Sequence, residues 1–227
     1  ELASLFNIDF SMPLQKKNEV SDNFLTPKIS FRFNPSEMKD YSLSENIINT
    51  DNAFALNRLG LSDTLEAGKS VTLGLDYIKQ SKNDLDQINN YFELKLATIF
   101  RDKEEKFIPN KSSLHRKNSN LFGSINNKFS SNLDLGYNFS LDNDYSTFEY
   151  NDLNATITIN NFVTKFNFIE EHGETGDANF LSSLLEYNFD KKNSLKFQTR
   201  RNRKLNLTEY YDLVYEYKND CLTAGIK

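Results

Sequence analysis

The chain has 227 residues, of which 38% are hydrophobic and 13% aromatic, and its formal net charge at pH 7 is −5. Its 19 phenylalanines and 11 tyrosines exceed what disordered segments carry, which excludes an intrinsically disordered protein. Charges of both signs are interspersed, which argues against a nucleic-acid partner. The sequence contains no run of about 18 apolar residues, so a membrane-spanning helix is not expected.

Apolar and polar residues alternate in successive segments along the chain, which predicts antiparallel β-strands rather than helices. The alternation marks about twelve strands. The segments are residues 6–12, 28–34, 71–77, 92–100, 121–129, 133–141, 153–160, 162–168, 181–189, 195–197, 211–218 and 222–226.

The sharpest local prediction is a hairpin at Asn160 and Asn161. Asparagine tolerates the positive φ angles that a two-residue hairpin turn requires. The alternating runs on either side therefore become neighbouring strands.

Two all-β architectures fit this alternation. In a soluble sandwich the charged face meets water and the apolar faces form a core, whereas in an outer-membrane barrel the apolar face meets lipid and the charged face a wet lumen. Periodicity alone does not separate them, although the mid-strand charges are regular enough to favour the barrel; they are Asp134, Lys165, Glu186, Lys196, Arg200 and Glu216.

The lengths of the connections add support for a barrel. Short connections, near residues 130–131, 160–161, 190–193 and 218–221, mostly alternate with longer or more polar ones at 35–68, 101–119, 142–147, 171–179 and 201–208. Short turns at one rim and long loops at the other are typical of outer-membrane barrels, with the short turns in the periplasm. The connection at 80–89 falls on the short side and fits less well.

Cys221 is the only cysteine, and it lies in a turn on the predicted periplasmic rim. That compartment is oxidising, so a thiol there is suited to a disulfide with a partner outside this chain. The competing interpretation is an inert thiol.

The remaining candidate sites are sparse. The stretch RRNRKL could bind lipid phosphates through Arg200, Arg201, Arg203 and Lys204, or be a solvated loop. Pro27 and Pro35 flank a strand, where a missing backbone donor weakens pairing or simply punctuates the strand.

No sequence pattern indicates catalysis or a cofactor. His115 and His172 lie in polar loops without cysteines or a second nearby histidine, so no metal site is expected. Motifs for nucleophilic catalysis, zinc hydrolysis, phosphate loops and dinucleotide binding do not occur in the sequence, so an enzyme is not expected.

Three stretches together resemble the LptD family of lipopolysaccharide-assembly proteins: LTPKISFRFNP, NAFALNRLGLSDTLEAGKSVTLGLDY and YEYKNDCLTAGI. In the second stretch, Arg58, Gly60 and Asp63 match the family pattern, and Cys221 in the third matches a family cysteine position. The resemblance spans about residues 25–227. Within it, residues 80–210 match the family by their alternating pattern more than by individual residues.

The resemblance implies a large outer-membrane barrel that inserts lipopolysaccharide into the outer leaflet. It also implies an LptE-like lipoprotein inside the barrel and an N-terminal periplasmic jellyroll that receives lipopolysaccharide from an LptA-like bridge. In that family, cysteines of the barrel form disulfides to cysteines near the N-terminus, which suits Cys221.

The sequence thus predicts an all-β, antiparallel transmembrane barrel of outer-membrane type, present as an incomplete fragment. The chain begins and ends within alternating segments, so we expect residues 1–227 to be part of one barrel domain, with the jellyroll and the first and last strands elsewhere. The alternatives are another outer-membrane barrel, such as a porin or solute receptor, and a soluble surface β-sandwich.

Overall fold

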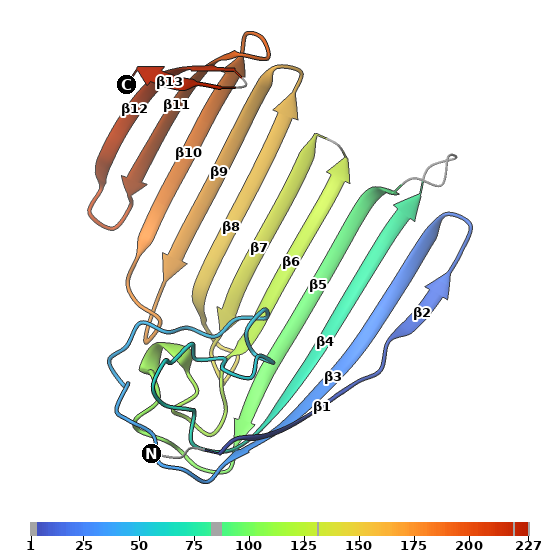
Figure 1. Ribbon diagram of the computed structural model, residues 1–227, viewed down its shortest axis with the longest axis vertical. Coiled ribbons are helices and arrows are strands. Elements are labelled where there is room, and N and C mark those ends of the chain that lie inside the picture. The colour runs from blue at the N-terminus through green and yellow to red at the C-terminus, as the bar shows by residue number, and fades with distance from the viewer. Residues whose placement is uncertain (1–3, 83–87, 131, 220, 227) are drawn as a thin grey trace.

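A computed structural model describes residues 4–82, 88–130, 132–219 and 221–226, and its strands form one antiparallel 13-stranded sheet (Figure 1). Neighbours in the sheet follow chain order from β3 onward. The strands are β1 (Phe6–Ser11), β2 (Leu14–Lys17), β3 (Ser21–Asn34), β4 (Gly68–Lys82), β5 (Ile88–Arg101), β6 (Leu121–Ser130), β7 (Leu133–Leu141), β8 (Phe148–Ile159), β9 (Phe162–Glu171), β10 (Asn179–Asn188), β11 (Asn193–Asn202), β12 (Leu207–Lys218) and β13 (Thr223–Ile226).

The predicted all-β fold is confirmed, and the twelve predicted strands are present. The additional strand is β2, which pairs with the same edge of β3 as β1 does. The sheet does not close on itself, since β1 and β13 end its strand order. Consecutive antiparallel strands in a single unclosed sheet are what part of an up-and-down barrel provides.

The break between β1 and β2 lies opposite Pro27. The Met12 N–H donates to the Pro27 carbonyl at 3.1 Å, so the backbone polar groups of Pro27 face the β1–β2 edge. Because proline has no N–H, β3 lacks a donor on this edge and loses none toward β4. Pro13 in the break removes a second donor, which explains why the first strand is interrupted.

The turn predicted at Asn160 and Asn161 is confirmed. Asn160 has φ of 51°, and the hairpin pairs Ile159 with Phe162 and continues to Tyr150 opposite Glu171. Asparagine adopts this left-handed conformation at lower cost than most residues. The turn residues therefore fix the register of β8 and β9.

Long and short connections lie at opposite ends of the sheet, as the sequence predicts (Figure 1). The long-loop end carries residues 35–67, 102–120, 142–147, 172–178 and 203–206, and the short-turn end carries 160–161 and 189–192. The predicted connections at 80–89, 130–131 and 218–221 lie partly outside the described residues. A consistent rim of each kind is the sidedness expected of an outer-membrane barrel.

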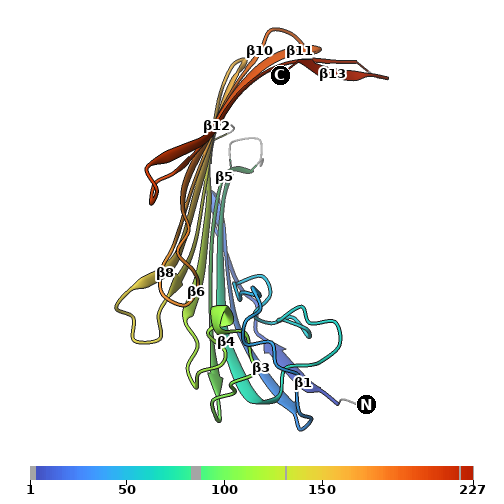
Figure 2. The ribbon, with the colours of Figure 1, turned by 90° about the vertical axis from the view of Figure 1, so that its left-hand side faces the viewer.

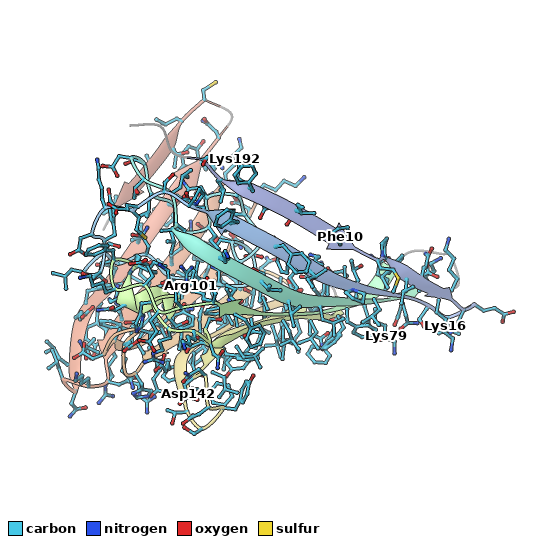
Figure 3. All side chains as sticks on the ribbon, turned by 90° about the horizontal axis from the view of Figure 1, so that it is seen from below. Phe10, Lys16, Lys79, Arg101, Asp142 and Lys192 are labelled. Carbon is cyan, nitrogen blue, oxygen red and sulfur yellow. The ribbon has the colours of Figure 1, made fainter. Side chains whose placement is uncertain are left out.

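The two faces of the sheet differ as the alternation predicts. The outer face carries exposed apolar side chains on β3–β6 and on β8–β12, including Phe31, Leu73, Ile157 and Leu213, whereas those of β7 are half-buried. The other face, which we call the inner face, carries the polar partners and lies on the side toward which the sheet curves (Figures 2 and 3). Arg101 lies on this inner side in Figure 3.

The buried apolar core does not lie between two sheets. It lies between the inner face of β5 and β6 and the loops of the long-loop end, and Ala97, Ile99 and Phe122 are its strand members. Figure 2 shows the segment 35–67 on this side of the sheet. No helix in the described part of the chain has the length and apolar character needed to cross a membrane.

Candidate functional site

Two long loops fold together onto the inner face, and we call residues 35–67 and 102–120 the loop plug. Ile48, Leu59 and Leu61 of the first loop are 2–6% exposed, and Ile108 and Leu114 of the second are fully buried. Their shared core rests on β5 and β6. A short 3₁₀ helix, Asn110–Ser112, lies within the second loop.

Phe54 fixes the plug to the middle of β4. A Cβ atom on Gly74 would lie 2.6 Å from the Phe54 ring, so only glycine lets the ring approach the sheet this closely. The Lys28 ammonium lies 5.7 Å from the centre of the same ring. The strand sequence is therefore adapted to the loop that covers it.

A buried ion cluster fastens the plug near the long-loop end. The Arg58 guanidinium donates to both carboxylate oxygens of Glu66, from Nε at 2.6 Å and from Nη2 at 2.5 Å. It also donates to Thr72 and Ser70 of β4, each at 2.9 Å. Arg58 thus joins its own loop to the inner face of the sheet.

Two further arginines approach the same carboxylate from the strands. Arg101 at the end of β5 forms an ion pair with Glu66, and Arg32 Nη1 of β3 lies 3.6 Å from it. Arg32 also donates to the carbonyl of Ala55 at 2.6 Å. Three guanidinium groups around one carboxylate leave this cluster with two net positive charges.

Burial and charge act in opposite directions on Glu66. Burial alone would raise its pKa, but the attraction and hydrogen bonds of Arg58, with Arg101 and Arg32, outweigh burial and lower the pKa to about 2. Glu66 is therefore ionised at neutral pH. It is the counter-ion that allows three arginines to remain buried.

Two guanidinium nitrogens of the cluster, Nε of Arg32 and Nε of Arg101, are buried and have no hydrogen-bond partner. An unpartnered buried donor is costly, so the cluster depends on its carboxylate. Asn34 also stabilises the ion cluster, since its side-chain amide donates to the backbone carbonyl of Glu66 at 3.0 Å.

The structure separates the three loop residues that the sequence singled out. Arg58 is buried in the ion cluster, whereas Asp63 is exposed and pairs with Lys39 at 2.6 Å. Gly60 has φ of 64° and supplies a turn between them. The sequence did not single out Glu66, Arg32 or Arg101. The available signal was that Arg32 and Arg101 each lie near the end of a strand, at a position of its polar face.

Apart from Glu149 at the start of β8, which Asn120 of the plug contacts, the inner face of β8–β12 has no comparable cover among the described residues. It carries polar pairs between neighbouring strands. Lys196 lies 3.2 Å from Glu216. The Gln198 amide donates to Asp212 at 3.2 Å, and the Asn167 amide to Asp152 at 2.7 Å. We call this region the open wall.

The basic stretch divides between the two faces. Arg200 lies on the inner face, stacked on Phe180 and 3.1 Å from Glu209, and Lys204 pairs with Asp177. Arg201 shares the outer face with its register partner Leu181. Arg203 also lies on the outer face, where its guanidinium carbon is 5.2 Å from the centre of the Phe168 ring.

The remaining sequence candidates lie apart from the ion cluster. Cys221 is an exposed free thiol between β12 and β13, at the short-turn end, and its N–H donates to Asn219 at 3.0 Å. Pro35 follows the last residue of β3 and ends that strand. His115 lies 3.4 Å from Glu174 and His172 lies 3.5 Å from Glu170, both in long loops.

Comparison with known proteins agrees with this architecture. Residues 2–191 match the family described as LptD, LPS transport system D. No curated protein matches the chain. The family match covers most of the chain, including the sheet up to β10, the whole loop plug and the first part of the open wall. The antiparallel sheet is consistent with part of a β-barrel, and the chain therefore belongs to the LptD family of lipopolysaccharide transport proteins, which are outer-membrane proteins.

Proposed function

We propose that this chain is part of the wall of an outer-membrane translocon that inserts lipopolysaccharide into the outer leaflet. The family match supports lipopolysaccharide transport. The carrying observation is that one continuous sheet has an apolar outer face and a polar inner face left open over β8–β12. An inner face of this kind suits the sugar portion, while the acyl chains follow an apolar route.

The barrel is completed by segments outside this chain. We propose an N-terminal periplasmic jellyroll that receives lipopolysaccharide from an LptA-like bridge, together with the first and last strands of the barrel. An LptE-like lipoprotein occupies the lumen beside the open wall. Its place there is supported by the loop plug, whose core packs at the long-loop end of the sheet and which reaches β8 through the Asn120 amide, a donor to Glu149 at 2.6 Å. No covalent chemistry is part of this function.

Cys221 forms a disulfide with a cysteine of the N-terminal region in this proposal. Its exposure at the short-turn end, which faces the periplasm in outer-membrane barrels, supports that role. Reduction of the intact protein changes its mobility on a non-reducing gel, and Cys221→Ser abolishes the change. Equal mobility of both proteins under both conditions refutes the disulfide.

Two cations of the basic stretch contact lipid phosphates. Arg201 and Arg203 lie on the outer face at the long-loop end, where the headgroups of the outer leaflet lie in this orientation. Arginine binds phosphate through paired hydrogen bonds. Arg200 and Lys204 instead hold Glu209 and Asp177.

Adjacent positions of β8 test the wall assignment in the full-length protein. A spin label at Ile157 reports hydrocarbon and one at Thr158 reports water, because the two side chains lie on opposite faces. Equal accessibility to a water-soluble relaxation agent at both positions refutes the assignment.

The transport role is tested in cells that depend on the variant. Thr156→Trp narrows the inner face and lowers the amount of lipopolysaccharide at the cell surface, whereas Ile157→Trp faces lipid and leaves it unchanged. Heat-modifiable gel mobility confirms that both variants fold. Normal surface delivery by a folded protein that carries bulky residues throughout the inner face of β8 contradicts the proposed route.

A further inference from the structure

We propose that the outer face of β1, β3, β4 and β5 holds a docking groove for an acylated lipid with a phosphate on its headgroup. The groove has a volume of about 590 Å³ and its apolar lining consists of Phe6, Ile8, Phe31, Phe33, Val71 and Phe100. Small-molecule sites typically measure about 300–1,000 Å³. The groove is therefore large enough for part of an acyl chain.

The groove is built by the alternation of the strands. Arg32, Ser70 and Arg101 also border it, although their side chains turn to the inner face, so these positions form its floor. Phe6 and Phe33 stack across β1 and β3 with their ring centres 6.2 Å apart, and they form one wall. The inner-face ion cluster thus holds three strands in place behind an apolar recess.

Lys69 gives the groove a charged end. Its ammonium lies 5.5 Å from the centre of the Phe33 ring, on the outer face and at the long-loop end of β4. A cation at the headgroup level attracts a phosphate while the aromatic recess receives the attached chain. The positive charge of Lys69 favours a ligand with a phosphate. The outer face of a barrel meets hydrocarbon, which favours a lipid over a second protein.

Asp102 also borders the groove, and its N–H donates to the Lys69 carbonyl at 3.3 Å. Its carboxylate opposes the binding of a phosphate. We therefore expect Asp102→Asn to strengthen retention of the lipid. A zwitterionic lipid, which would need this carboxylate for its amine, predicts the opposite result.

Lys79 provides a matched control on the same strand. Lys69 and Lys79 are both exposed and lie on the same face of β4, at opposite ends separated by roughly 33 Å. Lys79 is labelled in Figure 3 and does not border the groove. The inference rests on the proposed orientation, in which the long-loop end lies in the outer leaflet.

The experiment measures lipid retained by the full-length protein in native mass spectrometry, with bisphosphorylated lipid A and its dephosphorylated form as probes. Lys69→Gln lowers retention of the phosphorylated probe roughly fivefold and Lys69→Arg restores it, whereas Lys79→Gln has no effect. Val71→Trp fills the groove and lowers retention of both probes.

Equal retention by the Lys69→Gln and Lys79→Gln proteins overturns the phosphate site, and unchanged retention by Val71→Trp overturns the groove. Weaker retention by Asp102→Asn overturns the choice of an anionic lipid. Because binding is measured on purified protein, its failure together with normal surface delivery of lipopolysaccharide leaves the transport proposal intact.

Discussion

The inner face of one sheet has two different environments. Under the loop plug, the side chains of Arg58, Glu66 and Arg101 are 1–3% exposed, whereas those of Lys196 and Glu216 on the open wall are 28% and 29% exposed. The strand alternation is the same in both regions. Alternation therefore determines which face a residue occupies, and the loops determine whether that face is dry or wet.

The difference in solvent changes the strength of the ionic interactions. Charges are weakly screened in a buried site and strongly screened near water. Losing one partner is costly under the plug because it leaves an uncompensated buried charge, whereas water replaces a lost partner on the open wall. Matched substitutions in the two regions measure this contrast.

The largest effect is expected at Glu66. Glu66→Gln keeps the shape of the side chain but leaves three buried arginines without a counter-ion, which costs about 3–5 kcal/mol. We expect amide hydrogen exchange in residues 35–67 of the full-length protein to accelerate accordingly. The sheet core of β8–β11 keeps its protection.

Glu45→Gln is the control for this substitution. Glu45 pairs with Lys111 in the same plug, but its side chain is 79% exposed. Its loss leaves exchange in the plug unchanged. Equal acceleration by both substitutions would contradict a special role for the buried cluster.

The apolar part of the plug predicts a similar contrast. Ile99 is fully buried between β5 and the plug, so Ile99→Ala lowers the stability of the plug by about 2–5 kcal/mol. Leu184 occupies an inner-face position of β10 on the open wall and is only partly buried. Leu184→Ala therefore has a clearly smaller effect in the same exchange measurement, and equal losses would show that the open wall is also covered.

The sheet was predictable from the sequence because its determinants are local. Alternation marked the strands, and Asn160 and Asn161 marked a turn whose backbone the structure confirms. β2 was missed because Leu14–Lys17 is short and shows almost no alternation. The four residues of β2 form a strand because they pair with β3, not because of their own sequence pattern.

The plug was not predictable because its contacts are distant in sequence. Glu66 joins Arg58 nearby, but it also joins Arg32 and Arg101, which lie 34 and 35 residues away. Neither loop has a helical or strand period that indicates burial. Arg58 was identified only through family resemblance, and its partner Glu66 depends on the three-dimensional fold.

Acid provides a third test of the contrast. The pKa of Glu66 is lowered from 4.5 to about 2, so its contribution to plug stability is complete above pH 4.5 and is lost as the pH falls through 2. The shift corresponds to about 3 kcal/mol. Hydrogen exchange in residues 35–67 stays constant from pH 7 to 5, after correction for intrinsic rates, and accelerates below 4.5.

The Glu66→Gln protein isolates this titration. The pKa of Asp63 is also lowered, first by its hydrogen bond from Lys39, but Asp63 lies on the surface of the plug. If hydrogen exchange in residues 35–67 of the Glu66→Gln protein accelerates in acid as much as in the unmodified protein, other carboxyl groups cause the acid response.

The smallest effect is expected on the open wall. Glu216→Gln removes the partner of Lys196, which water and Glu186 at 4.0 Å partly replace, so we expect a loss below about 1 kcal/mol. Raising the salt concentration from 0.1 to 1 M, which shortens the screening length from about 10 to 3 Å, removes most of this loss. The Glu66→Gln effect persists in the same salt because solvent ions do not reach the buried cluster. A salt-insensitive loss at Glu216 would show that the open wall is as dry as the plug.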